Sequence, residues 1–250
     1  MTSRFMNQVA IVTGAGQGLG RASALRLAED GCDVLIVDIH QAQAETVAQQ
    51  IRQLGRKAAI FIGDVGDHAV GQEIVEQALQ ELGDVHILVN NAGILRDSLL
   101  VKLTEANFDE VIRINLKGVF NCGQAFACTL IEKGHGGAMV NISSLAYEGN
   151  LGQTNYAAAK AGVVAMTRTW AMELARYGIR ANAIAPGLMD TTMIANIPEK
   201  IKADLIHHIP LRRPGKPEEL AATVSFLASE EASYITGHVV VLDGGASLGL

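Results

Sequence analysis

The sequence predicts an α/β protein with one doubly wound parallel sheet and helices on both of its faces. Seven short apolar runs alternate with helical patterns along the chain, and such runs are typical of strands buried in a parallel sheet. Hydrophobic residues make up 49% of the 250 residues but aromatic residues only 4%, so small aliphatic side chains must fill the core. Alternating strands and helices favour right-handed crossover units.

The elements follow one another in a regular order. We expect strands at Val9–Val12, Val34–Val37, Ala58–Ile62, Ile87–Val89, Met139–Ile142, Asn182–Ala185 and Val239–Leu242. We expect helices at Leu19–Asp30, Ala42–Leu54, Val70–Leu82, Phe108–Glu132, Thr154–Arg176 and Pro217–Ala228. No linker, repeat or charged block divides the chain. Residues 1–250 are therefore expected to form a single catalytic domain.

The segment from Gly187 to Pro214 interrupts this alternation. It follows a strand but shows no clear element, and it mixes apolar residues with Pro and His. Long irregular segments in compact domains are often lids or binding loops. We expect residues 187–214 to form a substrate lid; a pair of surface helices packed on the core is the alternative.

Composition argues against several function classes. The net charge is −6 and no run of Lys or Arg occurs, which disfavours nucleic-acid binding. The apolar runs are too short to span a bilayer, and the first eight residues lack the apolar segment of a secretory signal. Cys32, Cys122 and Cys128 show neither metal-ligand spacing nor a disulfide framework. We therefore expect a cytoplasmic protein with no membrane contact and no bound metal.

A glycine-rich turn between the first strand and the first helix predicts a phosphate-binding site. Residues 13–20 read TGAGQGLG. Glycines allow the backbone to approach a pyrophosphate, and the following helix N-terminus offers free N–H groups and a positive dipole end. The Gly-Lys-Ser/Thr ending of a P-loop is missing. We expect a Rossmann-type dinucleotide site that uses Gly14, Gln17, Gly18, Leu19 and Gly20.

Asp38, at the end of the second strand, predicts which dinucleotide binds. It lies eighteen residues after Gly20, where a carboxylate accepts hydrogen bonds from the adenosine ribose and would repel a 2′-phosphate. Ile39 and Gln17 supply no positive charge beside it. The sequence therefore predicts NAD(H) in preference to NADP(H). The alternative is that Asp38 only caps the next helix.

Two further pairs of residues follow strands that end at the same edge. Asp64 and Val65 come after the third strand, and Asn90 and Asn91 after the fourth. The carboxyl ends of the strands in an open α/β sheet line the ligand crevice. We expect Asp64 and Val65 near the adenine and Asn90 and Asn91 near the cofactor, with ordinary turn chemistry as the alternative.

Four residues suggest acid–base chemistry. Tyr156 and Lys160 are four apart in a helical pattern and share one face, and a nearby ammonium lowers the pKa of a phenol from its usual value of about 10. Such a tyrosine could exchange a proton with a carbonyl or alcohol. Ser143 ends a strand and could hydrogen-bond the same oxygen, or merely its own backbone. No Gly-x-Ser-x-Gly motif surrounds it. Asn115, inside a helical pattern, could bond a backbone carbonyl or hold a water.

Taken together, these motifs resemble the short-chain dehydrogenase/reductase family. The similarity runs from Val9 to Gly245 and keeps the family's order: the glycine turn, Asn90-Asn91-Ala92-Gly93, Asn115, Ser143, Tyr156 with Lys160, and Pro186-Gly187. The resemblance implies hydride transfer between nicotinamide C4 and a substrate carbon, without a metal. It also implies a homo-oligomer, either a tetramer or a dimer.

The resemblance further implies a role for each site residue. Tyr156 would be the acid/base, Ser143 would polarise the carbonyl, and Lys160 would bind the nicotinamide ribose and lower the pKa of Tyr156. Asn115 would hold a water that links Lys160 to solvent. The nicotinamide would be closed in by Pro186, Gly187, Met189 and Thr191.

Within the family, residues 91–100, 152–162 and 234–245 are most similar to the 3-oxoacyl-[acyl-carrier-protein] reductases. Two departures stand out. Those reductases generally use NADPH, whereas Asp38 argues for NAD. Those that serve a carrier protein tend to place basic residues on helices beside the site entrance, where this chain has Gly134 and Tyr177 with Lys133 and Arg176 next to them.

Three functions remain open. The first is NAD-linked oxidoreduction of 3-oxoacyl or 3-hydroxyacyl thioesters, and the second is dehydrogenation of small or cyclic secondary alcohols. The third is a non-catalytic NAD-binding sensor; a Rossmann-like methyltransferase would leave Tyr156 and Lys160 unexplained. The small-molecule substrate is expected in a mostly apolar pocket formed by Leu95, Ser144, Leu145, Asn150, Leu151, Leu188, Met193 and His207.

Overall fold

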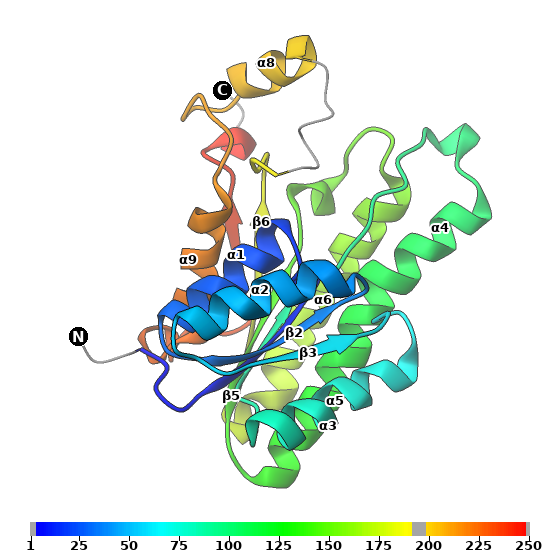
Figure 1. Cartoon of the computed structure of the whole chain (residues 1–250). Helices are drawn as coiled ribbons and strands as arrows, with labels where there is room; N and C mark the ends of the chain where they lie inside the picture. The colour runs from blue at the N-terminus through cyan, green and yellow to red at the C-terminus, as the bar shows by residue number, and fades with distance from the viewer. Residues whose placement is uncertain (1–3, 192–198, 249–250) are drawn as a thin grey trace.

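The computed structural model describes residues 4–191 and 199–248, and its strands pair in one parallel sheet (Figure 1). The strand order β3-β2-β1-β4-β5-β6-β7 confirms the predicted doubly wound sheet. The order reverses between β1 and β4, so a ligand crevice is expected where the loops after these two strands diverge. The strands are β1 (Val9–Thr13), β2 (Asp33–Asp38), β3 (Ala58–Ile62), β4 (Ile87–Asn90), β5 (Gly137–Ile142), β6 (Ile179–Pro186) and β7 (Val239–Leu242).

Helices cover both faces of the sheet and create two apolar cores. Val12 and Leu27 belong to the core beneath α1, α2 and α9, whereas Ile11 and Phe126 belong to the core beneath α3, α5 and α6. Adjacent strand residues therefore supply opposite faces, as β geometry requires. The main helical elements are α1 (Gly18–Glu29), α2 (Gln41–Gln53), α3 (His68–Leu82), α4 (Glu105–Ile112), η2 (Arg113–Lys117), α5 (Gly118–Lys133), η3 (Leu145–Glu148), α6 (Thr154–Leu174), η4 (Ala175–Tyr177), α8 (Glu199–His207) and α9 (Pro217–Ala228).

The two edge strands are less buried than the sequence predicts. The strands in the middle of the sheet are almost entirely buried, but Ile62 of β3 is 44% exposed and Val241 of β7 is 41% exposed. The expectation of strands buried on both faces is wrong for β3 and β7, because each has a neighbour on one side only.

The helical pattern at Phe108–Glu132 forms a longer and less regular helix than predicted. It starts three residues earlier, at Glu105, because Thr104 accepts a hydrogen bond from the Asn107 N–H at 3.2 Å and caps the first turn. A π-helical turn, η2, then separates α4 from α5. Such turns inside α-helices are often found at functional sites, and this one carries Asn115.

The segment predicted as a lid contains one described helix, which only the alternative of surface helices anticipates. Residues 187–214 include α8, which Figure 1 shows beyond the end of β6. Nine residues are too few to give a clear helical period, which explains the omission. Met189 and Gly215 pair where the segment leaves and rejoins the domain. Met193 lies outside the described residues. None of the described helices is long and apolar enough to cross a membrane.

Candidate active site

The turn after β1 requires glycine at several positions. Gly14 and Gly18 have φ angles of 62° and 53°, in the left-handed region that side chains disfavour. A Cβ on Gly20 would overlap the carbonyl oxygen of Gly14. The backbone of the turn therefore packs directly against the first turn of α1, beside the side chain of Asn91.

The same turn leaves the N-terminus of α1 open. Gln17 is the N-cap residue, and its side chain makes no capping hydrogen bond. A Cβ on Gly18 would meet only the Thr191 methyl, at 4.0 Å. Free helix N–H groups facing open space fit a pyrophosphate, and the structure brings the predicted residue Thr191 to this point. The residues present therefore fit the dinucleotide that the sequence predicts.

The side chains of Asn90 and Asn91 are both hydrogen-bonded within the protein. The Asn91 amide donates to the carbonyls of Thr13 and Gly14 at 2.9 and 3.1 Å and so holds the glycine turn. Asn90 is 2% exposed and donates to Asn141 of β5 at 2.8 Å. The side chain of Asn90 is therefore used inside the sheet, and the predicted contact of this residue with the cofactor stays a prediction.

Asp38 is fixed against the glycine turn. Its two carboxylate oxygens accept hydrogen bonds from the N–H groups of Gly16, at 2.8 Å, and His40, at 3.0 Å. Each oxygen retains a lone pair for a further donor. The carboxylate is thus held in one orientation at the end of β2, next to the predicted phosphate site.

Asp64 and Val65 follow β3 and are tied to the long helix on the other side of the crevice. Asp64 accepts a hydrogen bond from Arg113 at 2.7 Å, and the carbonyl of Val65 accepts one from Asn121 at 2.8 Å. Burial alone would raise the pKa of the Asp64 carboxyl, but the hydrogen bonds from Arg113 and Gly66 hold it below its usual value. Asp64 is therefore an ionised acceptor with a set position.

Tyr156 and Lys160 share one face of α6, as predicted. The Lys160 ammonium lies 5.6 Å from the centre of the Tyr156 ring and donates to the carbonyl of Ile142 at 2.7 Å. Lys160 is 3% exposed, and burial lowers its pKa to about 8. A buried cation with one short protein hydrogen bond is costly to maintain, which is typical of a functional position.

The serine that meets Tyr156 is Ser144 rather than the predicted Ser143. Ser143 is 1% exposed, and its hydroxyl donates to the main-chain carbonyl of Lys160 at 3.0 Å. The Ser144 hydroxyl accepts from the Ala146 N–H at 3.2 Å and hydrogen-bonds the phenol oxygen of Tyr156. Ser143 lies two residues after Asn141 and continues the alternation of β5, so both side chains face α6. The expectation that Ser143 hydrogen-bonds the same oxygen as Tyr156 is therefore corrected.

The pKa of Tyr156 moves in the direction opposite to the expected one. Burial raises it, the negative charge of Asp97 raises it further, and only the Ser144 hydrogen bond lowers it. The Lys160 ammonium, 5.6 Å from the ring centre, does not reverse this shift. In the free protein Tyr156 is therefore a protonated phenol at neutral pH.

Asn115 forms a two-way clasp with the loop after β4. Its side-chain oxygen accepts from the Ile94 N–H at 2.8 Å, and its amide donates to the Ile94 carbonyl at 2.9 Å. The residue is fully buried in the π turn. The structure thus places Asn115 as an anchor for the loop, and its predicted water relay stays a prediction.

The residues predicted to enclose the nicotinamide lie at and after the end of β6. Pro186 is the last strand residue, and Gly187 follows it where a Cβ would lie 2.8 Å from the Asp243 Cβ. The Met189 side chain is 5% exposed and belongs to the apolar core. The predicted contact of Met189 with the nicotinamide stays a prediction.

The described residues of the predicted substrate pocket differ in burial. Met193 lies outside the described residues and is not placed. Ser144 contacts Tyr156, and Asn150 donates to Gln153 at 2.9 Å. The half-buried members are Leu95, Ser144, Leu145 and Leu188; the exposed members are Asn150, Leu151 and His207.

Sequence reasoning missed Asn155, which positions Tyr156. Asn155 is fully buried, and its amide donates to the carbonyls of Arg96 and Asn107, both at 3.1 Å. Its side-chain oxygen accepts from the Tyr156 N–H at 2.8 Å. Asn155 thus joins the loop after β4 and α4 to the helix that carries Tyr156. An Asn directly before Tyr156 near a helix start is the signal that could have revealed it.

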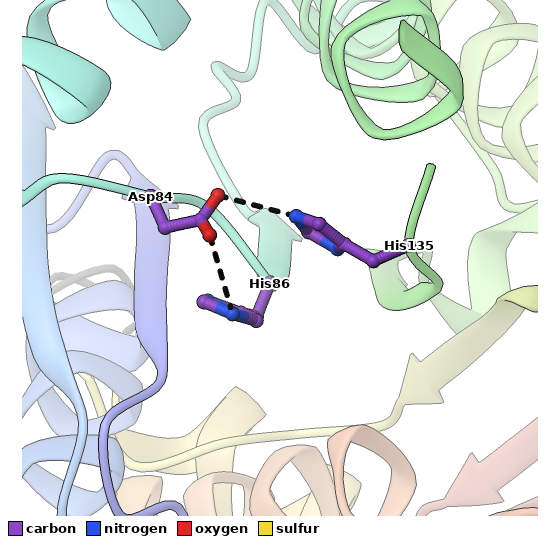
Figure 2. A group of neighbouring side chains, drawn as sticks. All are labelled: Asp84, His86 and His135. Carbon is purple, nitrogen blue, oxygen red and sulfur yellow. Dashed lines mark hydrogen bonds and ion pairs between the residues drawn. The ribbon is translucent and has the colours of Figure 1, made fainter. Parts of the chain in front are cut away.

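The opposite edge of the sheet holds a second group of titratable side chains, Asp84, His86 and His135 (Figure 2). It is the one candidate metal group among the residues that the structure describes. The Val9 N–H donates to Nδ1 of His86 at 3.1 Å, so neutral His86 carries its proton on Nε2, the atom that faces Asp84. A metal ligand needs a lone pair there. This donor set therefore does not fit a three-ligand metal site.

Comparisons with known proteins agree with this geometry. A family model described as Enoyl-(Acyl carrier protein) reductase matches residues 14–247. The chain is 45% identical to a 3-oxoacyl-[acyl-carrier-protein] reductase FabG of Thermotoga maritima, over 97% of this chain and 98% of that protein. It is 42% identical to the (2S)-[(R)-hydroxy(phenyl)methyl]succinyl-CoA dehydrogenase subunit BbsD of Thauera aromatica, over 97% of both chains.

A solved structure is similarly close. The crystal structure of a levodione reductase superposes with a TM-score of 0.94, at 37% identity, over 99% of this chain and 100% of that one. The likeness therefore covers the whole fold.

Proposed function

The chain belongs to the short-chain dehydrogenase/reductase family, and on that premise we propose that it is an NAD(H)-dependent reductase of 3-oxoacyl thioesters. The observation that carries this proposal is the meeting of Ser144 and Tyr156 above the buried Lys160, at the same sheet edge as the uncapped N-terminus of α1. A bound NADH would supply the hydride. The reverse reaction, oxidation of a 3-hydroxyacyl thioester, would use the same residues.

The protein's own groups are arranged to deliver a proton. Tyr156 would donate its phenol proton to the substrate carbonyl oxygen, and the Ser144 hydroxyl would hydrogen-bond the same oxygen as it gains negative charge. Lys160 would stabilise the phenolate that is left behind. Asn155 and Asn115 keep this set in place by fixing the loop after β4.

The protonation state of Tyr156 favours the reducing direction. Because burial raises the pKa of its phenol, Tyr156 holds its proton at neutral pH and can act as an acid without prior activation. Oxidation of an alcohol needs the phenolate instead. We therefore expect reduction to persist as the pH falls below neutrality and to decline in alkaline solution as Tyr156 loses its proton.

The proposal of NAD(H) over NADP(H) rests on Asp38. Its carboxylate is 8% exposed and is held by the N–H groups of Gly16 and His40, so it cannot easily turn away from a 2′-phosphate. The neighbouring N–H groups are neutral donors and do not cancel its charge. A phosphate placed there would meet a fixed negative charge of the same sign.

The proposal of a thioester, and of coenzyme A as its carrier, rests on the relatives and on charge placement. The Thauera relative is named as a CoA-thioester dehydrogenase. Lys133 and Arg176, the basic residues considered for a carrier protein, end α5 and lie in η4, at the edge of this chain opposite to Tyr156. Lys133 is already paired with Asp84 at 3.4 Å. Within one chain, neither Lys133 nor Arg176 therefore lies beside the site.

A second candidate is reduction of a small or cyclic ketone, favoured by the likeness to the levodione reductase structure. The discriminating experiment is a steady-state assay of the purified protein with acetoacetyl-CoA and with cyclohexanone, each with NADH and with NADPH. We expect the highest kcat/KM for acetoacetyl-CoA with NADH, and a value at least about a hundredfold lower with NADPH. Turnover of the ketone alone would replace the thioester proposal with the second candidate. A preference for NADPH would contradict the argument from Asp38.

A further inference from the structure

Arg113 connects the π turn η2 to the loop that follows β3. It begins the π turn η2, two residues before Asn115. Its guanidinium donates to Asp64 at 2.7 Å and lies 3.5 Å from the carboxylate of Asp67. Both acids belong to the loop after β3, which is far from Arg113 in the sequence and comes from the opposite half of the sheet order.

The loop that Arg113 contacts has a single arrangement. The second oxygen of Asp64 accepts from the Gly66 N–H at 2.8 Å, and the Asp67 N–H donates to the Asp64 carbonyl at 3.0 Å. Farther along the helix, Asn121 holds the Val65 carbonyl. Each Asp64 oxygen therefore has one lone pair engaged and one remaining for an outside donor.

The other side of the π turn is fixed by a different residue. Asn115 clasps the main chain of Ile94 with two hydrogen bonds, on the side of the reacting groups. The turn thus has two separate anchors, one toward the adenine loop through Arg113 and one toward the catalytic residues through Asn115. Loss of one anchor leaves the hydrogen bonds of the other intact.

We infer that Arg113 is a positioning residue that aims the Asp64 carboxylate at the amino group of adenine, and so sets cofactor affinity without taking part in the reaction. The inference rests on the proposed function, because it assumes that a nicotinamide dinucleotide binds along this edge. Arg113 orients the Asp64 carboxylate by one directed hydrogen bond and balances its negative charge.

The test compares Arg113→Met and Arg113→Lys with the unaltered protein. NADH and ADP affinities are measured by titration calorimetry, and KM for NADH and kcat are measured in the reductase assay. We expect Arg113→Met to weaken both ADP and NADH about tenfold and to raise KM for NADH similarly, with kcat at saturating NADH changed less than about twofold. Arg113→Lys should restore part of the affinity, because an ammonium can still reach one Asp64 oxygen.

Arg56→Met is the matched control. Arg56 pairs with Asp33 at the same 2.7 Å separation, but at the opposite edge of the sheet, where β2 begins. This variant should lose comparable stability and keep full ADP affinity. Equal affinities for ADP in Arg113→Met and the unaltered protein would overturn the inference, as would an equal loss in both variants. An unaltered protein that binds neither ADP nor NADH would overturn the proposed function as well.

Discussion

Polar groups differ in how they are partnered between the edge where the strands begin, the amino edge, and the edge where they end, the carboxyl edge. At the amino edge Arg180, near the start of β6, donates to four main-chain carbonyls: those of Leu227, Ala228, Ser229 and Ile235. At the carboxyl edge Lys160 is buried with one short protein hydrogen bond, to Ile142. The first cation closes the end of α9 and stabilises the fold. Burial of the second cation costs free energy, and its proposed role beside Tyr156 explains why that cost is retained.

The same contrast holds for the other polar groups. Asp84, at the amino edge, is paired with His86 and His135 (Figure 2) and also with Lys133. At the carboxyl edge, the helix α1 begins without a side-chain cap. Groups that already have partners support the structure, whereas groups left open can meet a ligand. Opposite edges of one sheet thereby separate stability from function, which suits an open α/β fold.

The largest expected effect falls on the carboxyl edge and leaves the fold intact. Tyr156→Phe removes the proton donor and should lower kcat about a thousandfold, while NADH still binds because the ring remains. Tyr147→Phe is the control, since Tyr147 lies in η3 and interacts with Glu148 rather than with the site. Steady-state kinetics and NADH titration measure both. Near-normal turnover by Tyr156→Phe would remove Tyr156 from its role.

The next effect should appear at the amino edge and leave the chemistry intact. Arg180→Met leaves three carbonyls at the end of α9 without this donor and removes one of two donors from the Ile235 carbonyl. We expect the free energy of unfolding to fall by about 3 kcal/mol. Denaturant titration measures the change. The KM for NADH should be unaltered in the fraction that folds. A loss below about 0.5 kcal/mol would show that the Arg180 hydrogen bonds do not stabilise this edge.

Lys160→Met should raise stability and lower activity, the reverse of what we expect for Arg180→Met. Replacing a buried ammonium by an apolar side chain should raise the free energy of unfolding at pH 7 by about 1 to 2 kcal/mol, reduced by the lost bond to Ile142, while activity falls sharply. Because burial lowers the pKa of Lys160 to about 8, the folded protein releases this proton before the unfolded chain does. The stability of the unaltered protein should therefore rise between about pH 8 and pH 10.5, and the advantage of Met should shrink. A stability difference between Lys160→Met and the unaltered protein that stays constant with pH would contradict the lowered pKa of Lys160.

The sequence predicted most of this architecture, for reasons visible in single residues. Strands such as Ala58–Ile62 and Val239–Leu242 have the predicted bounds, because polar or glycine residues border each apolar run. The glycine turn was readable because Gly14, Gly18 and Gly20 stand where side chains cannot.

Other features depend on three-dimensional contacts that a single sequence does not display. Ser143 and Ser144 are adjacent and chemically identical, and only the residue at which β5 ends decides which one faces Tyr156. Asn90 looked like a ligand contact because its partner Asn141 lies on another strand. The pair of Arg113 with Asp64 joins residues far apart in the chain.

The smallest expected effect concerns acid stability at the amino edge. Burial alone would raise the pKa of Asp84, but hydrogen bonds from Val85 and His135, together with the charge of His86, hold it below its usual value. A lowered carboxyl pKa contributes stability above the unfolded value, and that contribution is lost as the pH falls through the folded one. Asp84→Asn should therefore cost under about 1 kcal/mol at pH 7, because the side chain is about one-third exposed. Denaturant titrations should show a smaller difference in free energy of unfolding between Asp84→Asn and the unaltered protein at pH 3 than at pH 7. A difference that persists at pH 3 would point to packing instead.

The most direct test of the central claim, that Ser144 and Tyr156 act together at the carboxyl edge, is a paired measurement on Ser144→Ala and Ser143→Ala. Each variant is assayed for kcat on its reducible substrate with NADH and for its free energy of unfolding. We predict that Ser144→Ala lowers kcat about a hundredfold with little change in stability. Ser143→Ala should instead cost about 1 kcal/mol of stability, through its lost bond to Lys160, and keep most of its activity. The opposite pattern, with activity lost only in Ser143→Ala, would contradict the account.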